Sequence, residues 1–169
     1  MSLALITKDR RFWPLFWSQF LGAANDNFFK NALVILITYN SVNLLGLGAS
    51  SLVAAAGGVF ILPYVLFSAT AGQLADRYDK SDVIKVTKVT ELLVMILATI
   101  GFVTSSYELL FLVLFLMEAQ STFFGPVKYG CLPEVLTKQE LTLGNAFIAG
   151  GTFIAILIGT ILGGISASL

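Results

Sequence analysis

Apolar positions gather in five long runs along the chain. The runs span residues 12–38, 51–75, 83–104, 108–127 and 141–165. Each is about 20 residues or longer, which is the length that a helix needs to cross the hydrocarbon core of a bilayer. Strands would require alternation of apolar and polar positions, which the runs lack, and lipid admits only helices or closed barrels. The pattern therefore predicts an all-α membrane protein with five transmembrane helices.

The first run carries polar side chains near its middle, where residues 25–31 read NDNFFKN. Charges such as Asp26 and Lys30 cost on the order of 2.5–3.5 kcal/mol each at the centre of a membrane-spanning helix. They are tolerated when they face a protein interior or a wet cavity. We therefore expect this helix to line a polar path, as in a transporter or a channel.

On a helical wheel at about 100° per residue, Gln19, Gly22, Asp26 and Lys30 fall in one stripe, and Asn27 widens it. Asp26 and Lys30 are four residues apart, so their side chains can pair. Two interpretations follow from this spacing. The pair is either a structural ion pair that fixes helix packing or part of a substrate site formed with Gln19 and Asn27.

The fourth run contains Glu118 and Gln120 at its middle. Counted from either end of its run, Glu118 lies near the midplane of the membrane, as Asp26 does. Polar groups at one depth on two helices predict a common cavity that binds substrate. The alternative is one isolated hydrogen bond between two helices.

The fifth run is rich in glycine, and Gly159 and Gly163 have the GxxxG spacing. This spacing favours close packing of helices in membranes. The partner helix can belong to the same bundle or to a second copy of the chain.

Basic residues lie on one side of the predicted membrane. They precede the first helix, lie between the second and third, and lie between the fourth and fifth, whereas the two other connections have none. The residues used are Lys8, Arg10, Arg11, Arg77, Lys80, Lys128 and Lys138, with Lys85 and Lys88 just inside the third helix. The positive-inside rule then predicts a cytoplasmic N-terminus. An odd number of helices leads us to expect a partial bundle whose remainder lies outside this sequence.

Composition supports the membrane assignment and excludes several functions. Hydrophobic residues make up 57% of the chain and charged residues 12%, whereas soluble domains have about 25% charged residues. Histidine is absent and Cys131 is the single cysteine, so we expect no enzymatic histidine, no metal site and no cofactor. The net charge is zero without a basic block, so nucleic acid is not expected as a partner.

A charged turn, GQLADRYDK at residues 72–80, joins the second and third helices. Gly72, Asp76 and Arg77 match the loop signature of the major facilitator superfamily, in which a glycine is followed four residues later by Asp-Arg. That pattern continues with a glycine where this chain has Asp79. Asp76 can cap a helix or pair with an arginine. We predict that this turn participates in conformational change.

The segment FGPVKYG at residues 124–130 follows the polar centre of the fourth run. Gly125 and Pro126 predict that the helix ends or kinks here. Lys128 and Tyr129 would then lie at the cytoplasmic interface. There they meet a phosphate or an anionic lipid, or act as a plain aromatic anchor.

Together, residues 25–30, 72–80 and 124–134 resemble the lysophospholipid transporter family of the major facilitator superfamily. The similarity is greatest to the transporter portion of bacterial fusions with a glycerophospholipid acyltransferase. The resemblance implies a twelve-helix fold of two six-helix bundles. This chain would supply most of the N-terminal bundle and would pair with the remaining half of the transporter.

The same resemblance implies a function. Family members flip lysophospholipids, chiefly lysophosphatidylethanolamine, across the bacterial inner membrane for reacylation by a fused or separate acyltransferase. The acid at Asp26 would contact the zwitterionic head group, with membrane lipids around the bundle.

Other functions explain less of the sequence. An exporter of drugs or small metabolites would share the turn at 72–80 but not the other two segments. A membrane acyltransferase needs a nucleophile or a His-acid pair, and histidine is absent. A scaffold without transport would leave the polar stripe of the first helix unexplained.

Overall fold

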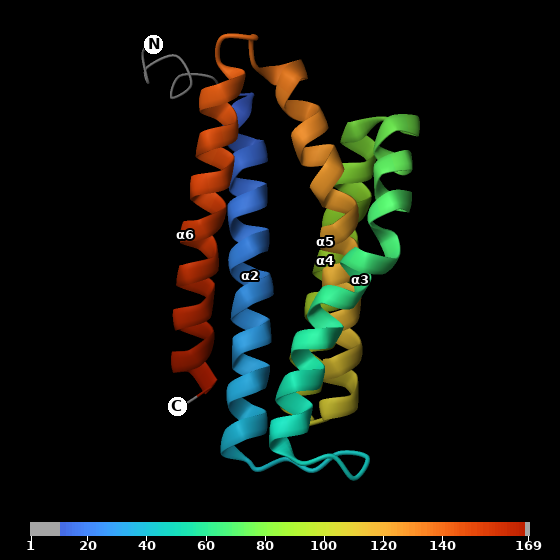
Figure 1. Cartoon of the computed structure of the whole chain (residues 1–169), viewed down its shortest axis with the longest axis vertical. Helices are drawn as coiled ribbons and strands as arrows, with labels where there is room; N and C mark the ends of the chain where they lie inside the picture. The colour runs from blue at the N-terminus through green and yellow to red at the C-terminus, as the bar shows by residue number, and fades with distance from the viewer. Residues whose placement is uncertain (1–10, 168–169) are drawn as a thin grey trace.

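The computed structural model describes residues 11–167, which form an elongated bundle of helices (Figure 1). The helices are α2 (Phe12–Tyr39), α3 (Ala49–Arg77), α4 (Lys80–Val103), α5 (Tyr107–Val135) and α6 (Leu141–Ala167). Within the described residues there is no β-strand beyond an isolated bridge between Leu44 and Leu47. Lys8 and Arg10, which contribute to the predicted orientation, lie outside the described residues.

Four of these helices, α3 to α6, are long and apolar enough to cross a membrane. The remaining helix, α2, has 28 residues and is therefore about 42 Å long at 1.5 Å per residue. Its central segment 25–31 interrupts the apolar sequence, so α2 is not among the four. The prediction of an all-α membrane bundle is confirmed, and α2 is its polar member.

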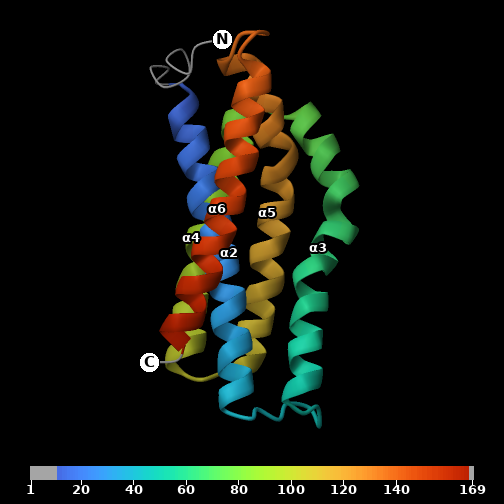
Figure 2. The ribbon, with the colours of Figure 1, turned by 60° about the vertical axis from the view of Figure 1, so that its left-hand side comes forward.

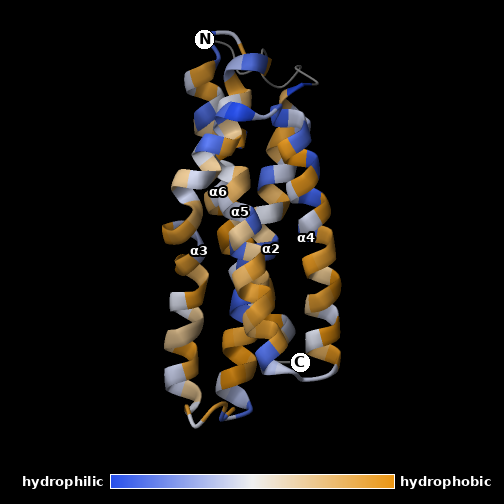
Figure 3. Ribbon diagram, turned by 90° about the vertical axis from the view of Figure 1, so that its right-hand side faces the viewer, coloured by the Kyte–Doolittle hydropathy of each residue, from blue (hydrophilic) through white to orange (hydrophobic). Residues whose placement is uncertain are grey.

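Hydrophobic residues predominate along the outer helices, such as α3 and α4 (Figure 3). Exposed examples on α4 and α6 include Val86, Leu92, Ile96, Phe153, Leu157 and Ile161. A surface of this kind would be unstable in water over so large an area, and it suits hydrocarbon. The polar residues of α2 are instead turned toward the other helices.

The bundle has two parts, with α2 packed along α6 and with α5 packed against both α3 and α4 (Figures 1 and 2). Gly159 and Gly163 allow the close approach of α6 to α2. A Cβ atom at either position would collide with the backbone carbonyl of Ala24 or Phe28. The GxxxG spacing therefore serves packing within the bundle, as one of the two interpretations held.

Two apolar clusters lie at opposite ends of the bundle. Phe12 and Leu15 of α2 belong to one cluster, and Phe29, Leu33 and Ile37 belong to the other. The polar positions of α2 lie between these two sets along the helix. The apolar clusters therefore hold both ends of the bundle together and leave its middle for polar side chains.

Helix α5 continues through Pro126 and Pro133 to Val135, whereas the sequence predicted its end at residue 127. Helix α3 likewise continues through Pro63, with a bend in its middle (Figure 2). Membrane helices tolerate proline because neighbouring helices and local adjustments satisfy the freed backbone groups. The extension places Lys128 and Tyr129 inside a helix instead of in a loop.

The packing of α2 on α6 generates a prediction about stability. Gly159→Ala forces a methyl group against the carbonyl of Ala24, which we expect to destabilise the folded chain by about 1–3 kcal/mol. Gly164→Ala is the matched control, because a Cβ there meets open space. Thermal unfolding in detergent micelles measures both. Equal melting temperatures for the two variants would contradict the close contact.

Candidate functional site

A polar cavity of about 170 Å³ lies in the middle of the bundle, between α2, α4 and α5. Its charged and amide side chains are Gln19, Asp26, Lys88, Gln120 and Lys128. Gly22, which has no side chain, and Ala23, which has only a methyl group, form part of the α2 wall and leave room in front of the polar groups. The cavity brings together residues that the sequence placed on two separate helices.

Asp26 is buried, with 7% of its surface exposed. Its Oδ2 accepts a hydrogen bond of 2.7 Å from the Ser121 hydroxyl of α5. Its Oδ1 has no hydrogen-bond partner within the part of the chain that the structure describes. A buried carboxylate oxygen without a donor is costly, so this site is suited to a ligand that supplies one.

Gln120 continues the same chain of hydrogen bonds. Its Nε2 donates to the Ser121 hydroxyl over 3.2 Å, and its Oε1 has no partner among residues 11–167. Glu118, two residues before Gln120 on α5, does not line this cavity. It interacts electrostatically with Asp26 and Lys30. The predicted common cavity thus joins Gln120 to Asp26, with Glu118 beside it.

Lys30 does not form the ion pair with Asp26 that the spacing permits. Its amine donates to Asn27 over 3.4 Å and lies 4.1 Å from the ring centroid of Phe60 on α3. The ion pairs among the described residues are Lys80–Glu134, Lys85–Asp82 and Lys88–Glu91. The Asp26 carboxylate meets Ser121 of α5 and the Lys30 amine meets Phe60 of α3, so the interpretation as a structural ion pair is wrong.

Lys88 is a cavity residue that the sequence analysis missed. Its amine donates to Glu91 over 2.7 Å and to the backbone carbonyl of Ser18 over 3.1 Å. It also lies 4.5 Å from the ring centroid of Phe124. A helical wheel of the third run would have found Lys88 and Glu91 on one face, three residues apart. Because Glu91 neutralises it, Lys88 adds no net charge to the cavity.

Lys128 also enters the cavity, from the extended part of α5. The residue is 9% exposed, and its amine lies 4.8 Å from the ring centroid of Tyr129. No hydrogen bond or ion pair joins this amine to another of the described residues. Tyr129 itself is 49% exposed. Lys128 therefore faces the bundle, while Tyr129 faces outward.

The remaining predicted residues of α2 form contacts within the bundle. Gln19 donates to the hydroxyl of Thr152 on α6 over 3.1 Å while it lines the cavity. Asn27 is buried, and its Nδ2 donates to the carbonyl of Ala23 over 2.9 Å. Both side chains link the polar stripe to structure around it.

The turn after α3 differs from the expected arrangement at one position. Asp79, not Asp76, caps the next helix, since its Oδ1 accepts a 2.8 Å hydrogen bond from the backbone of Ser81. Arg77 is the last residue of α3, and Asp76 is exposed. An acid in place of the superfamily's glycine therefore has a local role. Asp79 is the N-cap of α4, which begins at Lys80.

A helical membrane bundle with a buried, charged cavity at its middle is typical of secondary transporters. The family model of the Major Facilitator Superfamily matches residues 15–169. The chain belongs to the Major Facilitator Superfamily, and its four long apolar helices fit a multi-pass membrane protein.

Several curated relatives carry the name lysophospholipid transporter LplT. The protein from Photorhabdus laumondii is 32% identical over 106 residues, which are 63% of this chain and 25% of the relative. Those from Cronobacter sakazakii and Escherichia fergusonii are 31% and 32% identical over 64% and 66% of this chain, and over 26% of each relative. The chain thus spans about a quarter of the length of these relatives. No solved structure matches it significantly.

The half-buried Lys88–Glu91 pair generates a second prediction. Lys88→Met leaves Glu91 without its partner inside the bundle, which we expect to cost up to about 3 kcal/mol of folding free energy. Lys85→Met is the matched control on the same helix, because its pair with Asp82 is exposed. Chemical denaturation in detergent measures both variants.

Replacing both Lys88 and Glu91 distinguishes stability lost with the ion pair from stability lost with side-chain packing. The double variant Lys88→Met, Glu91→Leu should recover most of the stability, since it leaves no buried charge unpaired. A Lys88→Met protein as stable as Lys85→Met would show that the pair contributes nothing.

Proposed function

We propose that this chain is part of a transporter that moves lysophospholipids, chiefly lysophosphatidylethanolamine, across the bacterial inner membrane for reacylation. The observation that carries the proposal is the charge content of the cavity. Asp26 offers a carboxylate oxygen without a donor, and Lys128 offers an ammonium group without an acceptor among the described residues. The names of the curated relatives support the same substrate class.

The two charges match a zwitterionic head group. Lysophosphatidylethanolamine carries an ammonium and a phosphate, which Asp26 and Lys128 can meet at once. A purely anionic or purely cationic ligand would leave one of the two buried charges unpaired, and this is costly. We assign the phosphate to Lys128 because Lys30, the base expected from the sequence, lies toward Phe60 on α3.

We further propose an orientation of the chain in the membrane and the partners that complete it. The turns after α3 and after α5 lie at the same end of the bundle, where Lys80 and Glu134 form an ion pair of 2.6 Å (Figure 1). The positive-inside rule assigns this end, with the N-terminus, to the cytoplasm. The chain would form most of an N-terminal bundle, completed by a second half and served by a fused or separate acyltransferase.

Labelling of introduced cysteines tests the orientation. In a Cys131→Ser background, Thr104→Cys lies in the turn before α5 and Ser81→Cys lies at the start of α4. An impermeant thiol reagent added to intact cells should label position 104 and leave position 81 unlabelled until the membrane is opened. Labelling of position 81 alone from outside would reverse the proposed topology.

Asp26→Asn tests the function itself. The substitution keeps the size of the side chain and removes its charge, so the ammonium of the head group loses its partner. We expect uptake of radiolabelled lysophosphatidylethanolamine by spheroplasts that carry the intact protein to fall about tenfold or more. Uptake is normalised to the amount of transporter in the membrane.

Glu108→Gln is the matched control, because it removes an exposed carboxylate at the start of α5. Its uptake should equal that of the parent. If Asp26→Asn also transports at the parent rate, the acid serves only packing. If the parent lowers the accumulation of a small cationic drug but takes up no lysolipid, the protein is an exporter of the same superfamily.

A further inference from the structure

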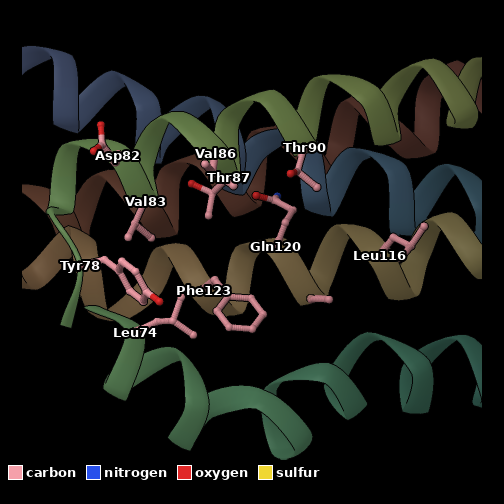
Figure 4. A pocket seen from close by; sticks show the side chains of 11 residues that line it. Leu74, Tyr78, Asp82, Val83, Val86, Thr87, Thr90, Leu116, Gln120 and Phe123 are labelled. Carbon is pink, nitrogen blue, oxygen red and sulfur yellow. The ribbon is translucent and has the colours of Figure 1, made fainter. Parts of the chain in front are cut away.

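A second hollow of about 390 Å³ lies between α3, α4 and α5 (Figure 4). Its walls are mainly apolar and include Leu74, Val83, Val86, Leu116 and Phe123. It lies toward the outer side of the bundle, whereas the polar cavity lies against α2. The hollow is thus suited to a hydrocarbon chain and unsuited to a charged group.

Gln120 lines both the polar cavity and the apolar hollow. It is 5% exposed, and Figure 4 shows its amide reaching from α5 toward α4, beside Thr87 and Thr90. A ligand that occupied both spaces would pass this side chain. Gln120 therefore marks the junction between a charged compartment and an apolar one.

The orientation of the Gln120 amide follows from its neighbours. The Ser121 hydroxyl has one hydrogen, which it donates to Asp26. It can then only accept from Gln120, so Nε2 faces Ser121 and Oε1 is directed away from it. That oxygen has no donor among residues 11–167. Buried amide oxygens are seldom left unpaired, and this one is suited to accept from a ligand hydroxyl.

We propose that Gln120 Oε1 accepts a hydrogen bond from the free glycerol hydroxyl of a lysophospholipid, a proposal that rests on the function proposed above. The head group lies in the polar cavity and the single acyl chain lies in the apolar hollow. The hydroxyl that defines a lysolipid stands between these two parts of the molecule, as Gln120 stands between the two spaces.

This contact makes Gln120 a specificity-determining residue. A diacyl phospholipid has an ester in place of the hydroxyl, and an ester can only accept hydrogen bonds. It would leave Oε1 unpaired and would add a second chain beside the first. Sites built to bond a ligand hydroxyl strongly reject an analogue that lacks it, because the buried protein group is then left without a partner.

Two ligands and two variants test the proposal. The ligands are lysophosphatidylethanolamine and a 2-deoxy analogue with the same acyl chain and no glycerol hydroxyl. Each competes with radiolabelled lysophosphatidylethanolamine for the intact protein. The parent should bind the deoxy analogue about tenfold more weakly or worse. Gln120→Leu should bind the two ligands equally well, and the exposed Gln73→Leu should discriminate as the parent does.

The outcomes separate this inference from the function on which it rests. A parent protein that binds lysophosphatidylethanolamine but not better than the deoxy analogue overturns the role of Gln120 alone. The same holds if Gln120→Leu weakens both ligands by one factor. A parent that binds neither ligand overturns the proposed function as well. Gln120→Asn, which draws the oxygen back from the junction, replaces Gln120→Leu if that variant does not accumulate.

Discussion

A carboxylate held out of water in the middle of the bundle is the constraint on which the rest of this structure depends. Asp26 has one hydrogen bond from a neighbouring helix, that of Ser121. Burial of a charge with so little compensation is costly. The two apolar clusters at the ends of the bundle supply the favourable burial that offsets it. The apolar clusters at the two ends of the bundle therefore stabilise the fold in which Asp26 is buried, and an ion pair with Lys30 does not.

The helices themselves were predictable, because long apolar runs and bilayer thickness determine them together. The end of α5 was not. Pro126 is a strong local signal for a helix to end, yet α5 continues to Val135, since packing between helices outweighs local preference in a membrane bundle. The error moved Lys128 from a helix into a loop and so concealed it from the predicted cavity.

The candidate site was predictable in part for a related reason. A helical wheel shows which side chains share one face of α2, and it correctly grouped Gln19 with Asp26. It does not show which neighbouring helix that face meets. The base of the cavity therefore could not be chosen among Lys30, Lys88 and Lys128 from spacing alone. That choice depends on how α2, α4 and α5 are rotated against one another.

The glycines of α6 have a consequence for the direction in which Asp26 points. Ala24 and Phe28 press their backbone carbonyls against Gly159 and Gly163. Asp26 is two residues from each, and so lies about 200° around α2 from that contact. Because the glycines have no side chains, the α2 backbone packs directly on α6, and this contact prevents α2 from rotating about its own axis. The direction of the Asp26 side chain is thus fixed by residues of α6, a helix on the opposite side of α2.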